Sequence, residues 1–582
     1  MGTRRFVTGL VALSAASACT IVPSSGNPTT VGKEDAGSDP MSQPYVRVIV
    51  SPPKQGATPV EIVQGFQAAM TGFDATSQKI AKQYLTPEAQ AKWNPAETDA
   101  VVCDCRFGVT NLPEADVAEF VLPIKGKRIA TIDPQGRYLS APADSEGAPL
   151  VDNITLVKLN GQWRIATPPP GLLLRPADLA RAYRSVDLYY PDVTGAGLVT
   201  DRVRLAIDPG RGFAESLIRR LLLGPSAPLA DGVQNMFPKN TKLRGIRVED
   251  DAVVMDFTGE LAQLSAYPER LRVLKAQLAW TFAAVAQLPI VITVNGEPFP
   301  GGGLPFQQRE YTAFDPAVLP HEALAYFVHN GTLMKQGRTW EESLPVPGAA
   351  GQPNQAFDHP AIAEIPYNRV AALRPEPGIW VADLANGSQW QRWITGDRLT
   401  PPSWDRYGEL WSVEQLPEGG SRVWRAREGQ AFPVSAPGLD AARVKAFRVA
   451  RNGVRAAVVA DSGAGESVQI GVIVRLGDYR MGGLEELVPP EQDRTIVDIA
   501  WQDDSTLLVL TEKAKQQSLL VYSIADGDGP DTPSVDQRVN SMSAAPGQIL
   551  AADEDGALRS SDGTKWATPI KSGVTYALYP LG

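Results

Sequence analysis

The sequence predicts two small α+β domains followed by an all-β propeller of about six blades. Before residue 310 the apolar pattern alternates between helical and strand spacing, and after it only strand-length segments follow. In this second half a polar turn followed by an apolar strand recurs at intervals of 40, 45, 52 and 42 residues, with turn residues Asn368, Gly408, Gly453, Ser505 and Gly547. Units of this length without helical periodicity are typical of propeller blades. Asn330-Gly331, 37 residues before Asn368, adds a sixth unit, so we assign the propeller to residues 310–582.

The N-terminus has the order of a bacterial secretory signal. Arg4 and Arg5 precede an apolar run of 13 residues, Phe6–Ala18, which is too short to span a bilayer. Small residues and then Cys19 end this run, as in a lipobox. We therefore predict a signal peptide over residues 1–18, cleaved before Cys19. Cys19 would carry an S-diacylglycerol and an N-palmitoyl group and would hold the protein on the outer face of the cytoplasmic membrane.

The segment after Cys19 is predicted to be a flexible tether over residues 19–50. It is rich in Ser, Thr, Gly, Pro, Asp and Asn and lacks periodic apolar residues, so it buries too little surface to fold. About 24 such residues would reach roughly 25–30 Å. The whole chain has 55 Lys and Arg against 65 Asp and Glu, a net charge of −10, which gives no electrostatic case for nucleic-acid binding.

Residues 51–170 are predicted to form the first α+β domain. Thr58-Pro59 begins a helix, with Thr58 as N-cap and Glu61 at the capping-box position. Strands are expected over Val117–Ile124 and Arg128–Ile132, and Asn160-Gly161 is expected to turn a final hairpin. Helices first and a curved sheet afterwards resemble the cone-shaped NTF2-like domains. That resemblance implies room for a small ligand, but we recognise no catalytic pair in the segment.

Residues 184–300 are predicted to form the second α+β domain. Its elements are a helix at Phe213–Leu223, a hairpin over residues 243–257 and a longer helix at Glu269–Gln287. The phrases RRLLLGPSA, GIRVEDDAVVMDF and VITVNGEPFPGGG, in this order, resemble the GerMN domain of sporulation and germination proteins. The resemblance implies an interaction or wall-associated module rather than an enzyme.

Cys103 and Cys105 are the only cysteines besides Cys19. They could be two small residues on one strand face, or they could form a local disulfide across a bend in an oxidising compartment. A metal site is disfavoured, because no histidine lies nearby and two thiols do not complete a tetrahedral shell.

No catalytic, cofactor-binding or metal-binding motif is recognisable. The chain has no Gly-x-Ser-x-Gly elbow and no phosphate loop. Its three histidines have poor metal spacing and are expected to be structural or exposed: His321, His329 and His359. Six tryptophans crowd one third of the propeller, and they could form blade cores or an aromatic binding surface: Trp380, Trp390, Trp393, Trp404, Trp411 and Trp424.

The order of lipobox, tether, NTF2-like domain, GerMN-like domain and propeller resembles the LpqB family of actinobacterial lipoproteins, as does the segment LTPPSWDRYGELWSV. The resemblance implies a non-enzymatic accessory of the MtrA–MtrB two-component system that contacts the extracytoplasmic domain of the sensor kinase MtrB and affects cell-wall and division homeostasis. The alternative is a propeller that binds or processes cell-wall glycan.

Overall fold

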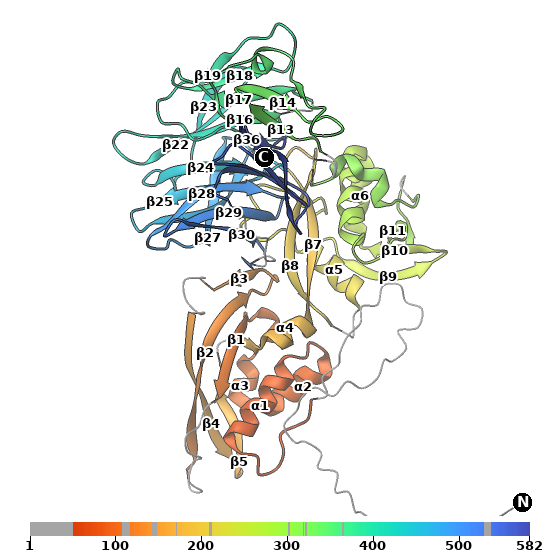
Figure 1. Ribbon diagram of the computed structural model, residues 1–582. Helices are drawn as coiled ribbons and strands as arrows, with labels where there is room; N and C mark the ends of the chain where they lie inside the picture. The colour runs from red at the N-terminus through yellow and green to blue at the C-terminus, as the bar shows by residue number, and fades with distance from the viewer. Residues whose placement is uncertain are drawn as a thin grey trace, which may run out of the picture.

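A computed structural model describes residues 50–107, 117–141, 148–169, 171–208, 212–300, 303–317, 319, 323–363, 366–525, 527–528 and 537–581. The chain forms an N-terminal domain that ends at Ala182, a middle domain from Tyr183 to Phe314, and a propeller from Ala325 onward (Figure 1). The fold class predicted from the sequence, two α+β domains and an all-β propeller, is confirmed. Within the described residues, no helix combines the length and apolar character needed to cross a bilayer.

The N-terminal domain packs helices on one face of a twisted sheet with the strand order β5-β4-β2-β1-β6, and β3 pairs with β2. The predicted capping box is present at its first helix, where Thr58 and Glu61 each accept from the other's backbone N–H. The two strands predicted around residue 126 are one long strand, β2. The elements are α1 Pro59–Met70, α2 Ala75–Gln83, α3 Pro87–Lys92, β1 Ala100–Phe107, β2 Glu119–Ile132, β3 Tyr138–Ser140, β4 Ala148–Leu159, β5 Gln162–Thr167, β6 Leu172–Leu174 and α4 Pro176–Ala182.

Cys103 and Cys105 form a disulfide, with their Cα atoms 5.2 Å apart. The two cysteines are two residues apart in β1, so their side chains share one face, and that face is buried; the pairing of β1 with β2 shifts by one residue just before them, between Val102 and Cys103. Gly126 lies opposite Cys105, and a Cβ at Gly126 would come within 2.8 Å of the Cys105 Cα. The glycine therefore gives the disulfide-bearing strand the room that it needs.

The middle domain combines a long two-stranded ribbon, β7–β8, with a four-stranded sheet of order β12-β11-β10-β9, in which β10 and β11 are parallel. The second helix, α6, packs against β7: the backbone N–H of Tyr189 donates to the Thr281 hydroxyl at 3.1 Å. It ends at Phe282, five residues before the predicted end at Gln287. The elements are β7 Tyr183–Pro191, β8 Leu198–Ala206, α5 Phe213–Leu222, β9 Leu243–Glu249, β10 Ala252–Phe257, α6 Pro268–Phe282, β11 Ile290–Val294 and β12 Glu297–Pro298.

The propeller has six four-stranded sheets in its described part, which we number as blades 1 to 6. The strands that line the axis, β36, β16, β20, β24, β28 and β32, neighbour one another around a closed ring. Blade 1 is β36 Val574–Leu578 with β13 Tyr326–His329, β14 Thr332–Lys335 and β15 Leu344–Pro345, and blade 2 is β16 Asp358–Ala363, β17 Arg369–Leu373, β18 Ile379–Asp383 and β19 Gln391–Ile394. Blade 3 is β20 Ser403–Trp404, β21 Leu410–Gln415, β22 Ser421–Arg427 and β23 Gln430–Val434, and blade 4 is β24 Arg443–Val449, β25 Arg455–Asp461, β26 Glu466–Val474 and β27 Arg480–Val488. Blade 5 is β28 Arg494–Trp501, β29 Thr506–Lys513, β30 Gln516–Ser523 and β31 Gly527–Asp528, and blade 6 is β32 Val539–Ala545, β33 Gln548–Asp553, β34 Leu558–Ser561 and β35 Trp566–Ile570.

Blade 1 closes the ring because the last strand, β36, pairs with β13. This changes the meaning of one predicted repeat. The turns at Asn368, Gly408, Gly453, Ser505 and Gly547 join the first and second strands of blades 2 to 6. Asn330-Gly331 instead joins β13 to β14, the second and third strands of blade 1. Sequence spacing groups this turn with the other five, because spacing cannot reveal that the first blade takes its inner strand from the C-terminus.

Candidate functional site at the junction of the middle domain and the propeller

The middle domain meets the propeller at three turns, each joining the first and second strands of a blade. These are residues 405–409 of blade 3, 450–454 of blade 4 and 502–505 of blade 5. The contact is close, because a Cβ at Gly197 would lie 2.0 Å from the Arg406 guanidinium. A Cβ at Gly232 would lie 2.6 Å from Val454. Three of the five turns that the sequence repeat marked thus carry the middle domain.

The two domains also share one hydrophobic core. The core of the middle domain, built around its helices and sheets, continues into the propeller through three buried valines of blade 4: Val454, Val472 and Val474. Burial of apolar surface across a boundary is what joins two domains into one body, whereas polar interfaces allow them to move. We therefore treat the middle domain and propeller as a single unit.

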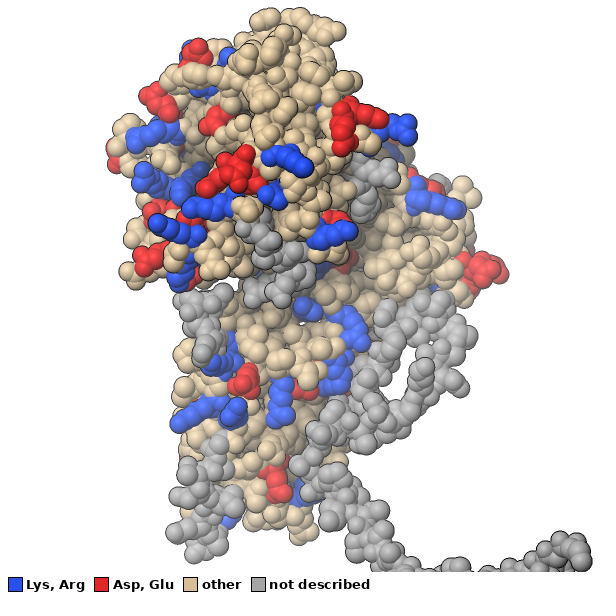
Figure 2. Space-filling model, viewed as in Figure 1, with Lys and Arg blue, Asp and Glu red and all other residues tan. Residues whose placement is uncertain are grey.

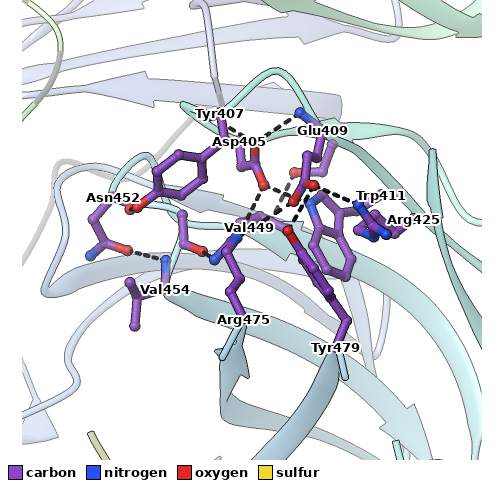
Figure 3. Close-up of polar contacts among 12 residues, drawn as sticks. Asp405, Tyr407, Glu409, Trp411, Arg425, Val449, Asn452, Val454, Arg475 and Tyr479 are labelled. Atoms are coloured by element: carbon purple, nitrogen blue, oxygen red, sulfur yellow. Dashed lines mark hydrogen bonds and ion pairs between the residues drawn. The ribbon is translucent and has the colours of Figure 1, made fainter. Parts of the chain in front are cut away.

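A buried charged cluster supports the blade 3 turn (Figure 3). One oxygen of Asp405 accepts from the backbone N–H groups of Tyr407 and Glu409, both at 2.9 Å. The other oxygen accepts from the Trp411 indole at 2.9 Å and from the Arg475 guanidinium at 2.5 Å. Four donors therefore hold a carboxylate that has no exposed surface, and this fixes the conformation of the turn.

Glu409 completes the cluster from the other side. Its carboxylate, 1% exposed, accepts from Arg425 at 2.7 Å, from the Tyr479 hydroxyl at 3.0 Å and from Arg475 at 3.4 Å. Arg475 also donates to the Gly453 carbonyl oxygen of the blade 4 turn. The single guanidinium of Arg475 therefore ties the blade 3 turn to the blade 4 turn, directly beneath the middle domain.

The electrostatics of the cluster follow from burial and from these partners. Burial raises the pKa of the Asp405 carboxyl, and the positive charge of Arg475 opposes that rise. Burial acts to lower the pKa of Arg475, but the neighbouring Asp405, Tyr407 and Glu409 more than offset it, so this pKa is raised. Burial, followed by the charge of Asp192 on the middle domain, raises the pKa of the Tyr407 hydroxyl. The guanidinium of Arg475 thus stays charged.

A second arginine, Arg455, joins blade 4, blade 5 and the ribbon. It is 7% exposed and donates to the carbonyl oxygens of Thr200, at 2.5 Å, and Asp504, at 3.2 Å. The Asp504 carboxylate accepts from the Thr200 backbone N–H at 2.9 Å. Burial lowers the pKa of Arg455, and Asp504 opposes that shift. Arg455 and Asp504 together fix the ribbon to blade 5, at a position away from the Arg475 cluster.

Arg451 closes the axis of the propeller on the same side. Its guanidinium, 1% exposed, donates to the carbonyl oxygens of Trp501 at 3.0 Å and Pro580 at 3.3 Å, and to that of Ala544. Burial lowers its pKa to about 10. One side chain from blade 4 thereby contacts the ends of three other inner strands. Both carboxylates of the cluster, Asp405 and Glu409, accept hydrogen bonds from protein donors. The cluster and its two neighbouring arginines therefore serve to position the domains.

Three family models match the chain in the order of its domains. "Lipoprotein LpqB, N-terminal domain" matches residues 52–180, "Sporulation and spore germination" matches residues 187–299, and "Lipoprotein LpqB beta-propeller domain" matches residues 331–577. Relatives named Lipoprotein LpqB are 28% identical in Thermobifida fusca, over 97% of this chain and 96% of the relative, and 28% identical in Streptomyces coelicolor, over 99% and 97%. The relative in Mycolicibacterium smegmatis is 27% identical over 94% of this chain and 93% of its own length.

The chain belongs to the LpqB family. As a member of a family of lipoproteins, it is a lipid-anchored membrane protein. Among solved structures, it is similar to TolB from Acinetobacter baumannii, with a TM-score of 0.34, 16% identity and coverage of 46% of this chain and 69% of that chain. Cys19, the predicted lipidation site of this LpqB family member, lies outside the described residues.

The structure separates the other residues that the sequence singled out. His321 lies outside the described residues, and His329 ends β13. His359 sits in a bulge of β16, with its Nδ1 3.0 Å from Asp358 and its ring 4.9 Å from that of Tyr576. No group of three or more possible metal ligands occurs in the described part of the chain.

Three of the six tryptophans are buried, and the other three are partly exposed. Trp404 and Trp411 are fully buried and Trp393 is 7% exposed, so these three belong to blade cores. The other three are partly exposed, each with an arginine side chain over its ring: Trp380 with Arg392, Trp390 with Arg374 and Trp424 with Arg422.

Sequence reasoning missed the roles of Asp405, Glu409 and Arg475. The first two lie in the segment WDRYGEL, which carries a turn of the propeller repeat and part of the family resemblance but no recognisable chemical motif. Two carboxylates four residues apart around a Tyr-Gly turn, next to tryptophans, were the available signal. Arg475 stands 66 residues beyond Glu409, and nothing in its local sequence distinguishes it from an exposed arginine.

Proposed function

We propose that this protein is a non-enzymatic accessory of the MtrA–MtrB two-component system, held on the outer face of the cytoplasmic membrane, where it contacts the extracytoplasmic domain of the sensor kinase MtrB. The observation that carries the proposal is the similarity to LpqB lipoproteins over 97% of the chain. It is supported by the build of the site, whose buried charges position domains and leave none of their carboxylates for chemistry.

Its mechanism is a population shift. A contact that binds one conformation of the kinase more tightly than another changes signalling by the difference between the two binding free energies. A body whose middle domain and propeller share one core presents such a surface without a cost of ordering it. The lipid anchor keeps this surface near the kinase, which raises its effective concentration.

The binding experiment uses the whole protein in detergent micelles and the purified MtrB extracytoplasmic domain. We expect saturable binding, and no binding to the extracytoplasmic domain of an unrelated sensor kinase. Absence of binding up to high micromolar concentrations would count against the proposal. Binding of both kinase domains with equal affinity would also contradict it, because it would show contact without specificity.

Anchoring has its own test. We expect Cys19→Ala to release the protein from the membrane fraction while leaving its folded domains intact, because the lipid is attached through this thiol. The matched control is Cys105→Ala, which removes a disulfide-bonded cysteine and should stay with the membrane. Measurement is by fractionation and immunoblotting, and full retention of Cys19→Ala would show that the anchor lies elsewhere.

A further inference from the structure

A cavity of about 620 Å³ lies where the three domains meet. It is lined by Tyr138 and Ser140 of the N-terminal domain, by Thr200 and Arg202 of the middle domain, and by Glu485 and Tyr522 of the propeller, among others. Sites for small molecules are commonly concave spaces of 300–1,000 Å³ at domain boundaries, lined by apolar side chains and a few placed polar groups. This cavity has that size, position and kind of lining.

The charges that line the cavity balance one another. Arg137 pairs with Glu485 across the boundary between the N-terminal domain and the propeller. Arg202 binds Asp187 at 2.6 Å, and Arg455 donates to backbone carbonyls as described above. Asp201 accepts from the backbone N–H and the hydroxyl of Ser226, at 2.7 and 2.8 Å.

Glu486 adds a carboxylate, so the lining has three positive and three negative side chains: Arg137, Arg202, Arg455, Asp201, Glu485 and Glu486. On the face that Figure 2 shows, side chains of both signs are likewise interspersed over the propeller. A balanced lining does not favour an ion of either sign, but it offers donors and acceptors in fixed positions.

The rest of the lining is aromatic, aliphatic and hydroxylic. Tyr138 presents its ring from the N-terminal domain, and the Arg204 guanidinium, 5.3 Å from the ring centroid, fixes its position. Ile129 and Leu487 add aliphatic surface, and Ser140 and Ser505 add hydroxyl groups. A ring beside paired charged groups suits a ligand that is apolar on one face and carries hydroxyl groups around its edge.

We propose that this cavity binds a neutral saccharide segment of a glycan. A sugar ring has C–H groups to pack on an aromatic side chain and hydroxyl groups to bond with fixed guanidinium and carboxylate groups. Because all three domains line the cavity, an occupant stabilises the arrangement in which they meet. This proposal does not depend on the proposed kinase contact, and either can stand without the other.

The test is titration of the whole protein with chitotetraose, a neutral oligosaccharide, followed by calorimetry and saturation-transfer NMR. We expect saturable binding and an affinity that does not change with salt, because screening acts on charged ligands. Tyr138→Ala should weaken binding about tenfold, through loss of the aromatic face. Tyr267→Ala is the matched control: this residue is 56% exposed and does not line the cavity.

A second variant keeps the test decisive if Tyr138→Ala does not fold. Ser140 is exposed at the cavity, so Ser140→Phe should fill the space without removing a buried contact and should abolish saturation transfer. Absence of saturable binding at millimolar chitotetraose would overturn the proposal, as would binding that both cavity variants leave unchanged. Tighter, salt-sensitive binding of an oligogalacturonate than of chitotetraose would overturn it too, by showing an anion site.

Discussion

The middle domain meets its two neighbours in different ways. Against the propeller it shares a hydrophobic core and is held by the buried Arg455, which is 7% exposed and donates to the Thr200 carbonyl oxygen. Against the N-terminal domain the contact combines a small apolar part, where Tyr183 of β7 packs in the N-terminal core 5.1 Å from the Phe73 ring, with the turn after β2. There Arg220 donates to the Gln135 carbonyl oxygen at 2.5 Å, and the Arg204 backbone N–H donates to that of Gly136 at 2.6 Å.

The N-terminal junction is also hollow. The 620 Å³ cavity lies on one side of this turn, and a second of about 670 Å³ lies between the N-terminal and middle domains. The ion pair that joins the N-terminal domain to the propeller, Arg137–Glu485, has side chains that are 25% and 42% exposed. Dry, shared cores resist relative motion, and partly exposed polar contacts do not. We infer that the N-terminal domain is the adjustable part of the molecule.

The largest expected effect is at the rigid junction. Arg475→Met should lower the free energy of unfolding of the propeller by about 3–5 kcal/mol, because Asp405 and Glu409 would remain buried without their shared cation. Urea unfolding followed by tryptophan fluorescence measures it, since Trp411 belongs to the cluster. Arg392→Met, which removes an exposed arginine over Trp380, is the control. A loss below about 1 kcal/mol would mean that the cluster behaves like a surface ion pair.

A smaller effect is expected from crowding the shared core. Gly232→Ala places a Cβ 2.5 Å from Val472 and 2.6 Å from Val454, and should cost about 1–3 kcal/mol in unfolding free energy. Gly245→Ala in β9 is the matched control, because a Cβ there meets nothing within 4 Å. Equal stability of the two variants would contradict close packing of the middle domain on blade 4.

The disulfide tests whether the N-terminal domain unfolds by itself. Cys103→Ala with Cys105→Ala opens a loop of three residues, so the loss should be about 1.5 kcal/mol from chain entropy. In scanning calorimetry we expect the transition of the N-terminal domain to shift and the transition of the middle domain and propeller to stay. A common shift of all transitions would show that the three domains unfold as one unit and would remove the contrast between the junctions.

The smallest effect belongs to the adjustable junction. Arg137→Gln and Glu485→Gln, singly and together, form a double-mutant cycle for the ion pair between the N-terminal domain and the propeller. The coupling free energy should be about 0.2–1 kcal/mol, because solvent screens a half-exposed pair. The measurement is urea unfolding at low and high salt. A coupling as large as that expected for Arg475 would make the two junctions equivalent.

Much of the fold could be predicted because it depends on local patterns. Thr58 and Glu61 form the capping box that their spacing predicts. Asn160 has the positive φ of 51° that a hairpin turn of this kind requires, and Gly161 follows at 74°. The repeat in the second half gives the propeller because each blade is one local unit of four strands.

The junction was beyond such reasoning because it depends on distant residues. Arg475 and Asp405 are 70 residues apart, and Arg455 and Thr200 are 255 apart. A charged residue has the same local pattern whether it ends exposed or buried, so its partner decides its role. The choice between a disulfide and two small core residues at Cys103 and Cys105 likewise depended on the fold, because residues two apart in a strand share a face in either case and only the folded strand brings their Cα atoms to 5.2 Å.

The sequence by itself determined the domain order, the propeller, the helices and turns of the first two domains, and the expectation of a lipid anchor at Cys19. These follow from hydrophobic period, turn chemistry and residue order, which act over a few neighbouring residues. Only the tertiary structure decided which turns of the repeat hold the middle domain, how blade 1 is closed by β36, and that a cavity opens where the three domains meet. Such features depend on which buried groups find partners, and burial is a property of the packed chain.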